Sequence, residues 1–356
     1  MTDERTRMVA HLDRRRGLHD RLATRLAALS DDELAALAPE TGSWRASVHG
    51  NQSGVIEFEG ARVFVKRIAL TDLERTVWNE GATANLFDLP MFYHYGVGSA
   101  GFGAWRELQA YLKASAWVRS GEQPYFPLVY HWRVLPRTPL LFSDQQRAWL
   151  DRAPSYWDHS EAVRARLEAI AAASASVVLF LEHVPQSLHA WRKDRLTGQD
   201  VDAGLEATIL RLLDQWQGAA AFMNDHGMLH FDLNADNVLT DGEQVYVADF
   251  GLAICEDFDL APAERAFVES HRLYDACYVA WAFADWLAPR SDPPVLTPGL
   301  SARIGRYDPV AKIFLKFIRT LSEESKTAPY PATELEAAFR RLRHADLAAE
   351  AKDVLL

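Results

Sequence analysis

The 356-residue chain has only two cysteines, Cys255 and Cys277, and no long hydrophobic run. Two cysteines cannot build a disulfide framework or a Cys-based zinc site, so a reducing cytoplasm is the expected location. The first residues are charged and lack the apolar core of a signal peptide. The longest charge-free, mainly apolar run, 169–181, is shorter than the roughly 20 residues of a membrane span. No membrane partner is expected.

The chain also lacks an excess of positive charge. Lysines and arginines number 38 against 49 acidic residues, which gives a formal net charge of −11. A chain of this charge does not attract nucleic acid through its overall field, so nucleic acid is not an expected partner. Apolar residues make up 49% and charged residues 24%, an ordinary globular composition that can form a core of normal size.

Three regions are predicted from residue periodicity: a helical extension over 1–41, an N-terminal lobe over 42–182 and a C-terminal lobe over 183–356. Leucines at one-face spacing predict the first helix, a capping box at 30–33 predicts a second, and the basic residues beside the leucines, Arg15 among them, are expected to be solvated. The predicted strands of the N-terminal lobe are 45–49, 55–59, 62–66, 127–135 and 176–181, with one helix over 105–118. The predicted fold class is α+β, with an antiparallel sheet followed by a mostly helical lobe.

The residues that carry chemistry lie in His230–Asn237 and in Val247–Gly251. Asp232 is followed by an Asn five residues later and by Asp249 beyond a β-hairpin that turns at Asp241-Gly242. Asn237 and Asp249 offer the oxygen ligands that Mg²⁺ prefers. Asp232 could orient a hydroxyl group and accept its proton. This spacing suits phosphoryl transfer.

An H-x-D-x-x-x-x-N segment followed by D-F-G resembles the protein-kinase-like superfamily, over about residues 42–290. The resemblance implies a bilobal kinase-like fold, with ATP and Mg²⁺ as cofactors. It assigns Asp232 to the catalytic aspartate and Asn237 and Asp249 to the metal ligands. His230 and Asp275 match residues that support the catalytic loop, although an exposed helix position is an alternative for Asp275.

The same resemblance directs attention to a phosphate-binding lysine on the third strand. Lys66 in Val63-Phe64-Val65-Lys66 fits, and the period of a strand puts Phe64 on the same face. Phe64 could stack on adenine, as aromatic rings at this position do in aminoglycoside phosphotransferases. Glu107 is the predicted acidic partner of Lys66, and Glu74 and Glu80 remain alternatives.

Two further segments are candidates for the nucleotide. The loop 50–54 lacks the G-x-G-x-x-G spacing of protein kinases, but Gly50, Ser53 and Gly54 could present backbone N–H groups to phosphate. A plain hairpin loop is an equal alternative. The segment after the strand 176–181 resembles a kinase hinge, whose backbone groups at Glu182 and Val184 would meet the adenine edge.

The acceptor side departs from protein kinases. Asn234 stands where protein kinases carry a lysine, and no A-P-E follows the D-F-G. The acidic stretch 256–259 would favour a cationic acceptor. The predicted function is ATP-dependent phosphate transfer to a hydroxyl of a small molecule such as an antibiotic or metabolite. A Ser/Thr protein kinase with a protein substrate is one alternative, and a nucleotide-binding pseudokinase with a regulatory role is another.

Overall fold

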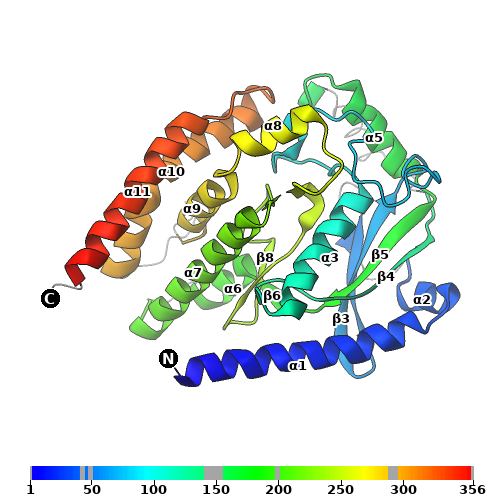
Figure 1. Ribbon diagram of the computed structural model, residues 1–356, viewed down its shortest axis with the longest axis horizontal. Helices are drawn as coiled ribbons and strands as arrows, with labels where there is room; N and C mark the ends of the chain where they lie inside the picture. Colours follow the sequence, from blue (N-terminus) through cyan, green and yellow to red (C-terminus); the bar gives the residue numbers. More distant parts are fainter. Residues whose placement is uncertain are drawn as a thin grey trace. The chain divides into compact units, whose positions relative to one another are not determined.

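The computed structural model describes residues 2–40, 45–46, 51–139, 155–196, 201–287 and 296–353. The fold is mixed α+β with an antiparallel sheet, as predicted (Figure 1). The chain forms two compact units: unit 1 comprises 1–94, 98–184 and 250–261, and unit 2 comprises 95–97, 185–249 and 262–356. In the described part of the chain, no helix combines the length and apolar character needed to cross a membrane.

Unit 1 is built on a five-stranded antiparallel sheet in the order β1-β2-β3-β5-β4. The strands are β1 (Arg45–Ala46), β2 (Gln52–Phe58), β3 (Ala61–Leu70), β4 (Val129–Pro136) and β5 (Ala175–Glu182). Glu59 and Gly60 join β2 to β3 with φ of 51° and 75°, the left-handed conformation that a two-residue hairpin needs. The inner strand β5 is buried from Ala175 to Leu181, so the sheet is covered on both faces at this strand.

The described part of unit 1 contains the helices α1 (Thr2–Ala27), α2 (Asp31–Leu37), α3 (Ala104–Ser120) and α5 (Glu161–Ala172). Short elements complete the unit: η1 (Met91–His94), η2 (Phe250–Leu252) and β10 (Ile254–Cys255). Helix α1 packs beside β4, α3 packs on β3, β4 and β5, and α5 contacts β3 (Figure 1). The capping box predicted at Ser30 is present, because Ser30 and Glu33 exchange hydrogen bonds at the start of α2.

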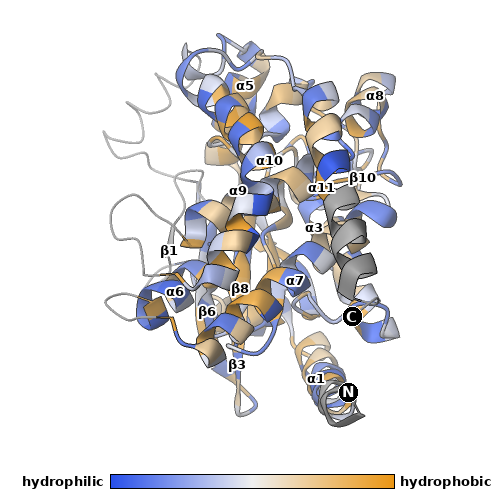
Figure 2. Ribbon diagram, turned by 90° about the vertical axis from the view of Figure 1, so that its left-hand side faces the viewer, coloured by the Kyte–Doolittle hydropathy of each residue, from blue (hydrophilic) through white to orange (hydrophobic). Residues whose placement is uncertain are grey.

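Unit 2 is mainly helical, as predicted. Its helices are α6 (Leu188–Leu196), α7 (Ala203–Asp225), α8 (Pro262–Ser270), α9 (Tyr274–Leu287), α10 (Pro298–Glu323) and α11 (Ala332–Asp353). The short strands are β6 (Gln186–Ser187), β7 (Met228–Leu229), β8 (Val238–Thr240) and β9 (Val245–Val247), with β6, β8 and β9 in one sheet. Helix α9 packs against α7 and α10, and α7 carries both apolar and polar residues, as expected of a helix covered on one side (Figure 2).

Two details of unit 1 differ from the sequence-based prediction. Strand β2 begins at Gln52 rather than at Val55, so it takes in part of the predicted loop. Helix α5 was not predicted at all, so the sheet is accompanied by more than the one helix expected. Ser160 caps this helix by accepting from the N–H of Val163, and its alanine-rich sequence follows directly.

Candidate active site

Lys66 forms a buried ion pair in unit 1. Strand β3 carries this lysine, which is 8% exposed, and its Nζ lies 2.6 Å from Oε1 of Glu107 on α3. The ring of Tyr111, one turn further along α3, lies 5.8 Å from the ammonium group. Phe64 stands two residues earlier on β3 and is half-buried. The structure therefore pairs Lys66 with the glutamate chosen from the sequence, while the binding roles of Lys66, Glu107 and Phe64 stay predictions.

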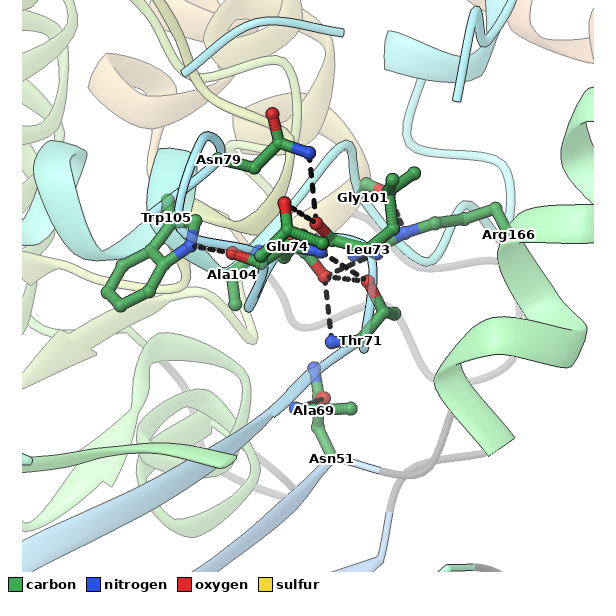
Figure 3. Close-up of polar contacts among 11 residues, drawn as sticks. Asn51, Ala69, Thr71, Leu73, Glu74, Asn79, Gly101, Ala104, Trp105 and Arg166 are labelled. Atoms are coloured by element: carbon green, nitrogen blue, oxygen red, sulfur yellow. Dashed lines mark hydrogen bonds and ion pairs between the residues drawn. The ribbon is translucent and has the colours of Figure 1, made fainter. Parts of the chain in front are cut away.

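Glu74, one alternative partner for Lys66, forms its ion pair and hydrogen bonds with other residues. Its carboxylate pairs with Arg166 of α5 at 2.9 Å, and both side chains are 2% exposed. Oε2 also accepts from the N–H and hydroxyl of Thr71, while Oε1 accepts from the N–H of Ala104 at 2.6 Å (Figure 3). Glu74 thus caps the N-terminus of α3, the helix that presents Glu107. The other alternative, Glu80, is exposed.

The end of β5 is braced by the first helix. Arg15 of α1 is 5% exposed, and its guanidinium donates to both carboxylate oxygens of Glu182 at 2.8 Å. It also donates to the carbonyls of Pro124 and Phe126. The expectation that Arg15 is solvated was therefore wrong: four carbonyl and carboxylate acceptors offset the cost of burying its charge.

One backbone N–H group of the predicted hinge already has a hydrogen-bond partner. The N–H of Glu182 donates to the carbonyl of Leu128 at 2.8 Å, and the side chain of Glu182 accepts from the N–H of Leu128. An adenine edge could therefore use other backbone groups of Glu182 and Val184, but not this N–H. Val184 is 9% exposed and ends unit 1 at this point of the chain.

Two of the three residues predicted to present N–H groups to phosphate do not lie in a loop. Ser53 and Gly54 lie in β2, where they pair with Lys66 and Val65 of β3. Gly50 lies outside the described residues. The predicted loop 50–54 included Ser53 and Gly54, but pairing with β3 makes both residues part of the sheet, because strand preference depends strongly on context.

Asp232 is the centre of the site in unit 2, and three side chains donate to its carboxylate. Oδ1 accepts from Nδ2 of Asn234 at 2.9 Å and from the hydroxyl of Tyr278 at 3.3 Å. Oδ2 accepts from Nδ2 of Asn237 at 2.8 Å, and the same nitrogen donates to the carbonyl of Asp232 at 2.9 Å. Burial raises the pKa of Asp232 to about 6, and the carboxylate of Asp249 raises it in the same direction.

In the described part of the chain, the side-chain nitrogen of Asn237 donates hydrogen bonds and its side-chain oxygen accepts none. Its amide nitrogen is used twice on Asp232, so Oδ1 is the atom that faces away from that residue. Asp249 supplies a carboxylate close enough to perturb the pKa of Asp232. An amide oxygen and a carboxylate suit Mg²⁺, which completes its shell with water and substrate phosphates. Within the described ranges, no group of three or more His, Cys, Asp and Glu side chains could hold a metal by itself.

Asp275 of α9 holds the loop that carries Asp232. Its two carboxylate oxygens accept from the N–H groups of His230 at 2.6 Å and Phe231 at 3.0 Å. The side chain of Asp275 is fully buried, and burial raises its pKa to about 6. His230 adds a second support: Nε2 contacts the carbonyl of Ala248 at 3.0 Å, and Nδ1 accepts from the N–H of Asp232. His230 thus connects the two motif segments within unit 2.

Two backbone positions of the site are strained. Phe231 and Asp249 have φ of 65° and 63°, a left-handed conformation that side chains other than glycine rarely adopt. Phe231 is fully buried and is fixed by Asp275 and by the ring of Tyr274 at 4.6 Å. Strain of this kind persists only where the surroundings impose it, and it concentrates at functional sites.

The acidic stretch 256–259 is partly occupied by contacts within unit 1. Asp257 pairs with Lys113 at 2.9 Å, and Asp259 accepts from the N–H and hydroxyl of Thr83. Phe258 is buried between them, 5% exposed. Two of the carboxylates expected to favour a cationic acceptor are therefore already used.

A cavity of about 180 Å³ adjoins the Asp232 loop in unit 2. Its lining comes from the loop, from α6 and from α9: His189, Arg192, Asn234, Ala235, Asp236, Trp281, Ala282, Asp285 and Trp286. Asn234 links the cavity to the site, because its side chain also donates to Asp232. Trp286 is held in place by its Nε1, which donates to the carbonyl of Leu188.

Two residues of the site were missed in the sequence. Tyr278 contacts Asp232 from α9, one turn after Asp275. Gly96 lies so close to Asp232 that a Cβ added to it would be 2.6 Å from Oδ1. The position of Tyr278 one helical turn after the predicted loop support could have indicated the first, whereas nothing local to Gly96 indicates the second.

Compared with known proteins, the chain matches no family model, and no curated protein is significantly similar to it in sequence.

Proposed function

We propose that the chain is a phosphotransferase that uses ATP and Mg²⁺ to phosphorylate a hydroxyl group of a small molecule. The observation that carries the proposal is the side chain of Asn237, whose nitrogen holds the carboxylate of Asp232 and whose oxygen remains for a cation. One residue thereby couples a general base to a metal position. Asp275 and His230 fix the loop on which both depend.

In this proposal Asp232 accepts the proton of the acceptor hydroxyl. The acceptor O–H bond breaks as its oxygen forms a bond to the γ-phosphorus, and the bond from that phosphorus to the β–γ bridging oxygen breaks to release ADP. A carboxylate with a pKa of about 6 is mostly ionised at neutral pH, yet basic enough to take the proton. Mg²⁺, when bound by Asn237 and Asp249, would neutralise charge on the phosphates.

Unit 1 contributes Lys66 to the proposal. A buried ammonium group oriented by a carboxylate at 2.6 Å is suited to contact the α- and β-phosphates of a nucleotide. Phe64, on the same strand and half-buried, is assigned to stacking on adenine. Capping of α3 by Glu74 supports this assignment indirectly, because that helix carries Glu107.

A small acceptor is favoured over a protein. The cavity beside Asn234 has about 180 Å³, less than a pocket for a whole drug-sized ligand, so it would receive one ring or substituent of the acceptor. Trp281 and Trp286 provide aromatic surface, and the two carboxylates of Asp236 and Asp285 outnumber the one guanidinium, that of Arg192. Such a lining suits an amine-bearing ring.

Calorimetric titration with a non-hydrolysable ATP analogue tests the nucleotide and metal assignments. We expect binding of the wild type to depend on Mg²⁺ and this dependence to disappear in Asp249→Ala. Asp225→Ala, at an exposed aspartate of the same unit outside the site, is the matched control and should retain the Mg²⁺ dependence. Equal affinity of the wild type with and without Mg²⁺ would contradict the proposal.

A further inference from the structure

Both sides of Oδ1 of Asp232 are occupied. A carboxylate oxygen accepts two hydrogen bonds through its two lone pairs. The amide of Asn234 and the hydroxyl of Tyr278 supply both donors to Oδ1. Among the described residues, Oδ2 receives one donor, from Asn237. The two oxygens of this carboxylate are therefore not equivalent.

Gly96 closes the Oδ1 side further. A Cβ built on Gly96 would lie 2.6 Å from Oδ1 and 3.1 Å from Cγ of Asp232, and 3.3 Å from the carbonyl oxygen of Phe231. The φ of Gly96 is not among the positive values, so its backbone would accept another residue. Glycine is required here by the approach to Asp232 and not by the conformation of the chain.

Tyr95 fixes this glycine within unit 2. The segment 95–97 belongs to unit 2, although the residues on both sides of it belong to unit 1. The hydroxyl of Tyr95 lies 2.8 Å from Nε2 of His271, and its ring packs edge-on against Phe317 at 5.1 Å. Tyr95 is 4% exposed. The backbone of Gly96 is thus held against Asp232 by a buried neighbour.

We propose that Gly96 and Tyr278 are positioning residues that fix the carboxylate of Asp232 with Oδ1 closed, so that Oδ2 is the atom that accepts the acceptor's proton. The assignment of Oδ2 rests on the proposed function, whereas the placement of the carboxylate does not. In the transfer step the proton moves from the acceptor oxygen to Oδ2. Asn234 is the third neighbour of Oδ1. It also lines the acceptor cavity, so it connects this cavity to the carboxylate of Asp232.

Two variants with matched controls test the placement through kinetics. Tyr278→Phe removes one long hydrogen bond and should lower kcat about three- to tenfold, with the KM for ATP unchanged. Gly96→Ala should lower kcat about ten- to a hundredfold, because its methyl group displaces the reacting carboxylate. Tyr330→Phe and Gly218→Ala are the controls: the Tyr330 hydroxyl has no hydrogen-bond partner in the described structure, and a Cβ on Gly218 meets nothing within 4 Å. Neither control should change kcat.

Melting temperatures at a fixed pH test the same contacts without any activity. Tyr278→Phe should lower the melting temperature of the wild type and have little effect in an Asp232→Ala background, where the hydroxyl has lost its acceptor. Gly96→Ala should also destabilise the wild type, but its cost should fall in that background because the clashing carboxylate is gone. Costs that are the same in both backgrounds would overturn the inference.

The two readouts separate this inference from the proposed function. If the melting temperatures couple as expected and the wild type phosphorylates no acceptor, the placement of Asp232 stands, but the phosphotransferase proposal and the assignment of Oδ2 fail. If the wild type transfers phosphate while Gly96→Ala and Tyr278→Phe keep full kcat, the positioning roles are refuted and the proposed function stands.

Discussion

Replacing Glu74 by alanine should destabilise unit 1 more than any change on its surface. The substitution leaves the guanidinium of Arg166, which is 2% exposed, without its carboxylate partner. Among the described residues, Arg166 then retains a long contact to the carbonyl of Gly101 and the ring of Phe87 at 5.1 Å. Breaking a buried ion pair by removing one partner costs about 3–5 kcal/mol.

The same substitution removes the cap of α3. Oε1 of Glu74 accepts from the N–H of Ala104, and loss of a helix cap costs about 1 kcal/mol. The expected loss therefore lies at the upper end of about 3–5 kcal/mol. At roughly 2–4 °C per kcal/mol, a loss of about 4–5 kcal/mol lowers the melting temperature by roughly 8–20 °C. Nucleotide affinity should fall as well, because α3 carries Glu107.

Urea unfolding followed by circular dichroism measures this loss. Glu80→Ala is the matched control, since Glu80 lies in the same loop but is exposed, and it should change the free energy of unfolding by less than about 0.5 kcal/mol. A loss below about 1 kcal/mol for Glu74→Ala would refute the reasoning. It would mean that Arg166 finds water or another partner at little cost.

Three further predictions concern the nucleotide, the acceptor and pH. Phe64→Ala should weaken binding of an ATP analogue by about 1–3 kcal/mol in calorimetry, and tighter binding would show that the ring obstructs the site. Trp281→Ala should raise the KM for the acceptor in steady-state kinetics and leave the KM for ATP unchanged; a rise in both would place the cavity outside the acceptor site. Burial lowers the pKa of His271 to about 4, so the folded state keeps this ring neutral and stability falls as pH drops from about 6.5 to 4. The free energy of unfolding of the wild type minus that of His271→Phe should fall by up to about 3 kcal/mol over this range, and a flat difference would contradict the lowered pKa.

The sequence was sufficient where local signals carry the information. The repeat of leucines in α1 and the capping box at Ser30 depend on neighbouring residues, and both elements were predicted correctly. The sequence allowed the three motif residues to be grouped, because only a short hairpin separates Asp232 and Asn237 from Asp249.

Contacts between distant residues account for what the sequence did not show. Arg15 was expected in solvent because it belongs to a group of basic residues beside the leucines of α1, and its partner Glu182 lies 167 residues away. Gly96 meets Asp232 across a similar distance along the chain. Ser53 and Gly54 look like loop residues locally, and only pairing with β3 makes them part of a strand.

Phosphate transfer by the wild type and by Asp232→Asn, measured side by side, tests the central claim most directly. The assay follows ATP consumption with a panel of amine-bearing hydroxyl compounds and a generic basic protein, and calorimetry measures binding of the ATP analogue to both proteins. We predict that the wild type phosphorylates a small molecule, and that Asp232→Asn loses a factor of about 10²–10⁴ in rate with its affinity for the analogue unchanged. Transfer at the wild-type rate by Asp232→Asn, or a wild type that binds the analogue with Mg²⁺ and phosphorylates nothing in the panel, would contradict the account.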